Sequence, residues 1–308
     1  KQEIVRAREV MERLCPPGKN ARISLWSGQA NPERAVIALA YADGQRNLNS
    51  GGAQFDPNHD SRLYLTPFVR DVGGVFQSLT SGRDDFGITE NLTLPAVCFS
   101  NVIQTFERTA SPRLLPVNVY GHFYTLANKG ARRGMDLIQD WLQRHVLHSV
   151  WVSEYLKMLE GFRSGVTAEL GPDEYEVHDH GACRTVRFDG RAPGTGVDLA
   201  RSAGVSGWNE HAGSLYVHLA SEATARIALS ATPPARPHVR SSTADLRDVT
   251  LKDDEVSVTT ESLTPISLEL AGFPPGAPVE VTRPLAEGEI VKLAGRMDEI
   301  MFQPGQSV

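Results

Sequence analysis

The chain has 308 residues, of which 41% are hydrophobic and 22% are charged. This length exceeds the roughly 100–200 residues of an ordinary domain, so we expect two domains. The composition excludes a disordered chain, because it supplies enough apolar side chains for a sizeable core. No run of about 18 apolar residues is present, which excludes a membrane-spanning helix.

The formal net charge of -6 is distributed unevenly along the chain. Residues 1–165 carry 19 Lys and Arg against 16 Asp and Glu, or +3, whereas residues 166–308 carry 12 against 21, or -9. The acidic half argues against nucleic-acid binding, which needs a basic face to neutralise phosphates. It suits a cationic partner such as an amine-bearing sugar polymer, or it serves solubility alone.

The sequence begins at Lys1 without the basic and apolar regions of a signal peptide, and we interpret it as a piece of a longer protein. Its three cysteines, Cys15, Cys98 and Cys183, are too widely spaced for a disulfide scaffold or a Cys-x-x-Cys zinc site. We expect them to be buried thiols, although one disulfide and one free thiol are equally compatible with the odd count.

Helix and strand patterns alternate in the first half of the chain. Apolar residues at 4, 7, 10, 11 and 14 share one helical face and predict a helix over 2–14. A strand over 22–26, a helix that begins at Asn31-Pro32 and ends near Gly44, and a strand over 46–49 predict a parallel βαβ unit. We expect further strands near 74–79, 115–123 and 148–152, and further helices over 131–146 and from Ser153. The order predicts an α/β domain over residues 1–165, with a parallel sheet that is open or closed into a barrel.

After Gly165 the helical period gives way to short runs of alternating apolar and polar residues. Clusters of Gly, Pro, Asn and Asp separate these runs at regular intervals. We therefore expect an all-β, jelly-roll-like sandwich over residues 166–308. Its clearest strands are expected at 175–178, 185–188, 214–219, 225–231, 256–259 and 266–270. The segment 284–308 has no clear period and is expected to fray.

Candidate binding residues lie at predicted strand ends, where parallel α/β folds bind their ligands. Trp26 ends the first strand, Asn49 ends the second, and Glu90 lies at a later strand end. Aromatic and amide side chains suit a sugar site, since one covers the apolar ring face and the other binds hydroxyl and acetamido groups. A place in the core is the alternative for Trp26.

His122 is the candidate for proton transfer. It follows an apolar run and lies in the segment Tyr120-Gly121-His122-Phe123-Tyr124, where a strand would deliver it to the rim of the sheet. An imidazole there can move a proton near neutral pH, although a hydrogen-bonded core histidine fits the position equally well.

His178-Asp179-His180 is a weaker candidate metal pair, and a solvated strand face is its favoured alternative. No nucleotide-binding motif is present.

Taken in order, several motifs resemble the second half of bacterial exopolysaccharide deacetylase domains. They are Leu25-Trp26-Ser27-Gly28 with Asn31-Pro32, Asn47 to Gly52, Thr89-Glu90-Asn91, Ser111-Pro112-Arg113 through Tyr120 to Tyr124, and Trp151 to Tyr155. The pattern is most similar to the PelA-like deacetylases of the biofilm exopolysaccharide Pel. The resemblance covers about residues 1–165, and the predicted sandwich resembles, less specifically, the accessory β-domain of such enzymes.

This resemblance implies a distorted (β/α) barrel that removes acetyl groups from an N-acetylhexosamine polymer in the periplasm, with a divalent, zinc-like metal. In the wider superfamily a metal-bound water attacks the acetamide carbonyl, an Asp is the base, and a late His protonates the departing amine. His122 matches the position of that acid. Tyr120 and Tyr124 then shape its pocket, and the candidate wall residues are Trp26, Asn49 and Glu90.

The sequence lacks the early acidic motif and the His-x-x-x-His pair that hold the metal in such enzymes. His145 and His148 are one residue too close together and belong to a later segment. We therefore expect the metal ligands and the base to precede Lys1, and this chain alone to be catalytically incomplete.

Two other functions stay open. The chain is alternatively a carbohydrate-binding or partner-docking module of an exopolysaccharide export complex, in which the acidic sandwich holds a cationic polymer or an export protein. A glycoside hydrolase needs two carboxylates roughly 5–9.5 Å apart across the sugar. Glu90 and Glu154 lie near predicted strand ends, but nothing in the sequence pairs them.

Overall fold

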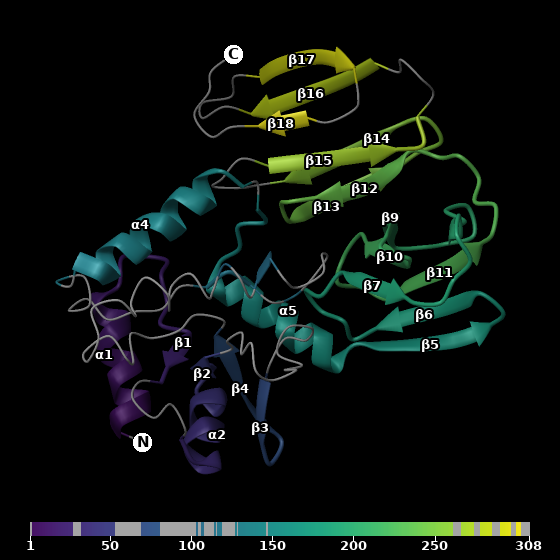
Figure 1. Cartoon of the computed structure of the whole chain (residues 1–308). Helices are drawn as coiled ribbons and strands as arrows, with labels where there is room; N and C mark the ends of the chain where they lie inside the picture. Colours follow the sequence, from purple (N-terminus) through teal and green to yellow (C-terminus); the bar gives the residue numbers. More distant parts are fainter. Residues whose placement is uncertain are drawn as a thin grey trace. The chain divides into compact units, whose positions relative to one another are not determined.

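The computed structural model describes residues 2–26, 32–52, 69–80, 103, 106–107, 114, 116–118, 127, 129–145, 147–260, 266–273, 278–284, 290–296 and 300–302. The chain divides into two compact units, residues 1–144 and 145–308, here called the N-terminal and C-terminal units (Figure 1). The predicted domain boundary at residue 165 lies one helix after this division. The chain is a mixed α/β protein that is rich in strands, and its described sheets are all open.

The N-terminal unit is built on a four-stranded sheet of order β1-β2-β4-β3. β1 (Ile23–Leu25), β2 (Arg46–Gly52) and β4 (Val75–Thr80) are parallel neighbours, and β3 (Val69–Val72) is antiparallel to β4. α2 (Arg34–Ala42) connects β1 to β2 and confirms the predicted βαβ unit. It ends before Gly44, whose left-handed φ of 77° favours glycine just beyond a helix. The described strands form an open sheet and not a barrel.

The first helix exposes much of its apolar face. A π-helical turn, η1 (Gln2–Arg6), leads into α1 (Ala7–Leu14), in which Val10, Met11 and Leu14 are 45%, 53% and 74% exposed. Arg8, on another side of α1, donates through Nε to Asp43 Oδ2 at 2.5 Å. A polar contact to the end of α2 therefore orients α1, and its apolar stripe faces away.

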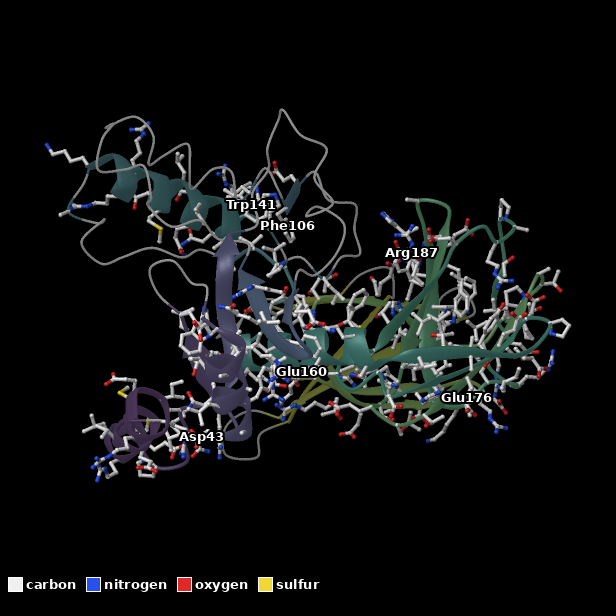
Figure 2. The ribbon with its side chains drawn as sticks, turned by 90° about the horizontal axis from the view of Figure 1, so that it is seen from below. Asp43, Phe106, Trp141, Glu160, Glu176 and Arg187 are labelled. Carbon is white, nitrogen blue, oxygen red and sulfur yellow. The ribbon has the colours of Figure 1, made fainter. Side chains whose placement is uncertain are left out.

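α4 (Lys129–Gln143) confirms the predicted helix over 131–146. Its buried Ile138 packs against Ile103, Met135 and Leu142. Trp141 contacts Phe106 edge to face with ring centroids 5.8 Å apart (Figure 2), and its indole donates to Glu107 Oε1 at 2.9 Å. Most of the predicted strand over 115–123 lies outside the described residues. Among the described helices, none is long and apolar enough to cross a membrane.

The C-terminal unit begins with α5 (Val152–Ser164), and the strand predicted at 148–152 is not formed. Trp151, and not Ser153, is the residue that precedes the helix. Gly161 lies against the turn after β6, because a Cβ there would be 2.8 Å from the His180 carbonyl carbon and closer still to its oxygen. α5 therefore packs closely on the turn that follows β6.

The remaining strands form a six-stranded sheet of order β18-β15-β12-β9-β10-β7, a four-stranded sheet of order β5-β6-β11-β8, and the hairpins β13-β14 and β16-β17. Their bounds are β5 (Val166–Gly171), β6 (Glu174–His178), β7 (Thr185–Phe188), β8 (Gly196–Val197), β9 (Val205–His211), β10 (Ser214–Leu219), β11 (Ala225–Ser230), β12 (His238–Ser242), β13 (Leu246–Leu251), β14 (Val256–Thr260), β15 (Ile266–Ala271), β16 (Pro278–Pro284), β17 (Ile290–Arg296) and β18 (Ile300–Phe302). All six strands expected in this half are present. β17 and β18 form within the segment that we expected to fray.

One hydrophobic core joins the two larger sheets. Residues of β6 to β11 contribute to it, and on two of these strands they alternate along the chain, as Leu215, Val217 and Leu219 do on β10 and Ala225, Ile227 and Leu229 do on β11. Strands whose inward side chains meet in this way leave every second residue on the opposite, outer face of the sheet.

Candidate functional site

Four of the six candidate site residues, Glu90, Tyr120, His122 and Tyr124, lie outside the described residues. Trp26 directly follows β1, whereas Asn49, which we expected to end the second strand, lies in the middle of β2 (Arg46–Gly52). Leu25 is opposite Leu48 in the β1–β2 register, and the Trp26 backbone N–H donates to the Leu48 carbonyl at 3.2 Å. The structure therefore brings Trp26 beside Asn49 of the neighbouring strand, but not to a shared strand end.

Polar residues cross the N-terminal sheet in a row. Ser24 is opposite Asn47 in the β1–β2 register, and Arg70 is opposite Gln77 in the β3–β4 register. Because Leu48 is opposite Ser78, Asn47 lies beside Gln77. Opposite residues in a sheet share a face. Ser24, Asn47, Gln77 and Arg70 therefore form one row across all four strands, here called the polar row.

Hydrogen bonds satisfy the buried amides of the polar row. Asn47 and Gln77 are both 0% exposed. Asn47 Nδ2 donates to the Ile37 carbonyl of α2 at 3.4 Å, and Gln77 Oε1 accepts from Arg70 Nη1 at 2.9 Å. The contact with Ile37 places the row on the face that α2 covers. An amide buried there without partners costs about 1–3 kcal/mol, which explains why each has one.

Trp26 is fixed by the polar row. Its Nε1 donates to Asn47 Oδ1 at 2.9 Å, and its side chain is half-buried. This hydrogen bond places the indole on the face that α2 covers. That position agrees with a place in the core, the alternative that the sequence left open for Trp26.

A second chain of polar contacts joins α1 to the sheet. Ser24 Oγ donates to Gln45 Oε1 at 2.5 Å, and Gln45 Nε2 donates to Asp43 Oδ2 at 2.9 Å. The hydrogen bond from Arg8, followed by that from Gln45, lowers the pKa of Asp43. Arg8 also pairs with Glu12 one turn further along α1. These contacts join α1, the end of α2 and β1 to one another.

The His178-Asp179-His180 segment does not form a metal pair. β6 ends at His178, and Asp179 has a left-handed φ of 56°, so the alternation of a strand stops before His180. His178 Nδ1 lies 2.9 Å from Asp179 Oδ2, whereas the buried His180 places Nε2 3.0 Å from the Ala223 carbonyl. Each imidazole thus has a separate local partner.

Glu154 is also placed differently from the prediction. It lies in the first turn of α5, where no strand precedes it, and both of its carboxylate oxygens are 3.0 Å from Lys157 Nζ. An acidic residue in a first helical turn favours the positive end of the helix dipole. A helical, ion-paired role accounts for Glu154, and its proposed partner Glu90 lies outside the described residues.

Within the described part of the chain, no three His, Cys, Asp or Glu side chains gather as ligands for a metal ion. Cys15 and Cys183 are half-buried free thiols, and Cys98 is not among the described residues. Burial raises the pKa of Cys183, which disfavours its thiolate. The described residues therefore do not supply the metal site that the resemblance implies.

The C-terminal unit carries a second polar row, which sequence reasoning missed. Tyr216 is opposite Arg187 on β7 and Asn209 on β9, and Arg187 Cζ lies 5.8 Å from the centre of the Tyr216 ring. Arg240 donates to Asn209 Oδ1 at 3.3 Å and to Glu269 Oε1 at 2.7 Å. These five residues form the outer row, on the face opposite the core. Strand alternation on β10 was the signal, because Tyr216 lies between two core residues.

The outer row belongs to one side of the C-terminal unit only. In Figure 2, Arg187 and Glu176 lie on opposite sides of this unit. Glu176 is on β6, where it pairs with Arg226 of β11, and Glu174 pairs with Arg201. The outer face of the four-stranded sheet is thus covered by separate ion pairs, whereas the outer row is continuous across five strands.

Comparisons with protein-family models, with curated proteins and with solved structures found no match to this chain.

Proposed function

We propose that the chain is part of a metal-dependent polysaccharide N-deacetylase that acts on an N-acetylhexosamine exopolysaccharide in the periplasm. The observation that supports the proposal is the parallel pairing of β1 and β2, because it brings Trp26 and Asn49, from two separate motifs, beside each other. Ligands of parallel α/β sheets bind at the carboxyl ends of the strands, and Trp26 directly follows that end of β1. The proposal requires further strands that close the N-terminal sheet into a distorted barrel, followed by a jelly-roll-like sandwich.

In this proposal His122 protonates the amine that departs from the acetyl group, and Tyr120 and Tyr124 shape its pocket. Trp26, Asn49 and Glu90 form the wall that binds the sugar. Because the described residues include no metal-ligand set, we derive no step through a metal and assign its ligands to another part of the enzyme.

A His122→Ala substitution in the longer protein tests the proposal. Loss of a general acid lowers turnover by about 10²–10⁴-fold, while binding of the acetylated polymer stays unchanged. Deacetylation is measured as acetate release, and binding by co-sedimentation with the polymer. His211→Ala, at an exposed histidine, is the matched control and should leave both unchanged.

The outer row favours a second candidate, a module that binds carbohydrate or an export partner. The two arginines of the outer row are exposed and Asn209 is half-buried, whereas Tyr216 is only 6% exposed. Arg and Asn side chains held at fixed positions on a sheet face suit the hydroxyl groups of a polymer. The net charge of -9 over residues 166–308 favours an amine-bearing chain. This candidate replaces the first if His122→Ala leaves acetate release intact, or abolishes polymer binding together with it.

A further inference from the structure

β5 is an open edge of the four-stranded sheet. It is the first strand in the order β5-β6-β11-β8, and among the described strands only β6 pairs with it (Figure 1). Three large apolar side chains are exposed within nine residues here, at Phe162 (47%), Val166 (44%) and Leu170 (55%). An apolar sheet edge of this kind is a template for pairing with another strand.

The sequence of β5 is complementary to itself. A twofold axis perpendicular to the sheet and centred on Ala168 places Val166 opposite Leu170 of a second copy, and Thr167 opposite Glu169. The larger apolar side chains then meet, the small Ala168 lies on the axis, and no like charges are opposed. An axis at Glu169 would instead oppose two carboxylates. With an axis at Thr167, no residue of the second copy's β5 would lie opposite Leu170.

We propose that β5 pairs antiparallel with β5 of a second copy of this chain, so that two four-stranded sheets become one continuous sheet. The β5–β6 register shifts between Glu169 and Gly171, which marks a bulge at Leu170. A bulge bends the strand, so pairing with a second copy extends no further than Leu170. Five residues from each copy are fewer than the roughly 20–30 a side of a standard specific interface, so dimerisation is weak and depends on concentration.

Single cysteines introduced along β5 report the register. Residues opposite each other on antiparallel strands have Cα atoms about 4.5–5.5 Å apart, within the range of a disulfide. Ala168→Cys therefore forms a disulfide-linked dimer under mild oxidation of the full chain. Thr167→Cys and Glu169→Cys are matched controls, because their own copies lie diagonally at about 7–8 Å and cross-link at least about fivefold less. The unsubstituted chain measures the background from Cys15, Cys98 and Cys183.

Sedimentation velocity at increasing concentration provides the second measurement. The unsubstituted chain shifts toward a dimer, and Leu170→Lys weakens the dimer at least about tenfold by opposing a charge to Val166 of the partner. The proposal is overturned if the chain stays monomeric throughout, or if positions 167, 168 and 169 cross-link equally. A dimer that Leu170→Lys does not weaken also overturns it, since that dimer uses another surface.

Discussion

β9 and β12 pair in parallel through one residue pair, in which Gly207 lies opposite Val239. A Cβ on Gly207 would lie 2.7 Å from the backbone nitrogen and carbonyl carbon of Val239, and closer still to its oxygen. Backbone atoms in a sheet cannot move aside as the end of a side chain can. The absence of a side chain at this residue therefore permits one six-stranded sheet instead of two separate halves.

Gly207→Ala is expected to lower the free energy of unfolding of the C-terminal unit by about 2–4 kcal/mol, because it forces strands apart within a packed sheet. Gly171→Ala is the control, since nothing lies within 4 Å of a Cβ at that position. It should change stability by less than about 0.5 kcal/mol. Urea denaturation measures both. Equal effects of the two substitutions would contradict the role of Gly207.

At the scale of elements, buried hydrogen bonds and not only apolar packing set how the N-terminal sheet meets its helices. Asn47 of β2 links Trp26 after β1 to the Ile37 carbonyl of α2. Arg8 of α1 is held by Asp43 after α2. Both contacts are directional, so they fix the position of each helix more narrowly than contact between apolar surfaces does.

Asn47→Leu is expected to destabilise the N-terminal unit by about 1–3 kcal/mol, because it removes the acceptor of the Trp26 indole and the donor to Ile37. In a double-mutant cycle, Trp26→Phe should cost less in the Asn47→Leu background than alone, with a coupling of about 0.5–1.5 kcal/mol. Leu25→Ala, at an exposed position on the same sheet, is the control. Strict additivity in urea denaturation would show that the hydrogen bond contributes nothing.

At the scale of the whole molecule, the two units differ in the groups that link stability to pH. Burial lowers the pKa of His218 and His238 in the C-terminal unit, so the folded state favours their neutral forms. Unfolded histidine titrates near pH 6.5, so their contribution is complete above that pH and is lost as the pH falls below it. Asp43 in the N-terminal unit has a lowered pKa. Its contribution is present above about pH 3.9 and is lost only in stronger acid.

We therefore expect the C-terminal unit to unfold at a lower urea concentration at pH 5 than at pH 7. Titration of Asp43 should not cause a matching change in the N-terminal unit over this pH range. Hydrogen exchange measured by mass spectrometry along a urea series resolves peptides from each unit. His218→Gln should reduce the pH dependence, whereas His211→Gln, at an exposed histidine, should not. A pH-independent C-terminal unit would refute this assignment.

Sequence patterns predicted local structure well where one physical signal dominated. Alternation located strands such as Thr185–Phe188 and Ser214–Leu219, because a two-residue period follows directly from side chains on opposite faces. Strands with a weak period were missed, among them β9, which contains Gly207, and β17. Periodicity identified the apolar face of α1 but not its exposure, since a local pattern does not show what lies beside a face.

The sequence by itself determined the α/β then all-β order of the chain and the βαβ unit around α2, although it ended the second strand at Asn49, three residues before the end of β2. Periodicity and the right-handed βαβ connection suffice for these. Only the tertiary structure decided which side chains meet, including Asn47 with Trp26, Arg8 with Asp43, and Arg240 with Asn209 and Glu269. Those partners come from separate elements, and their approach depends on strand order and register, which no local pattern encodes.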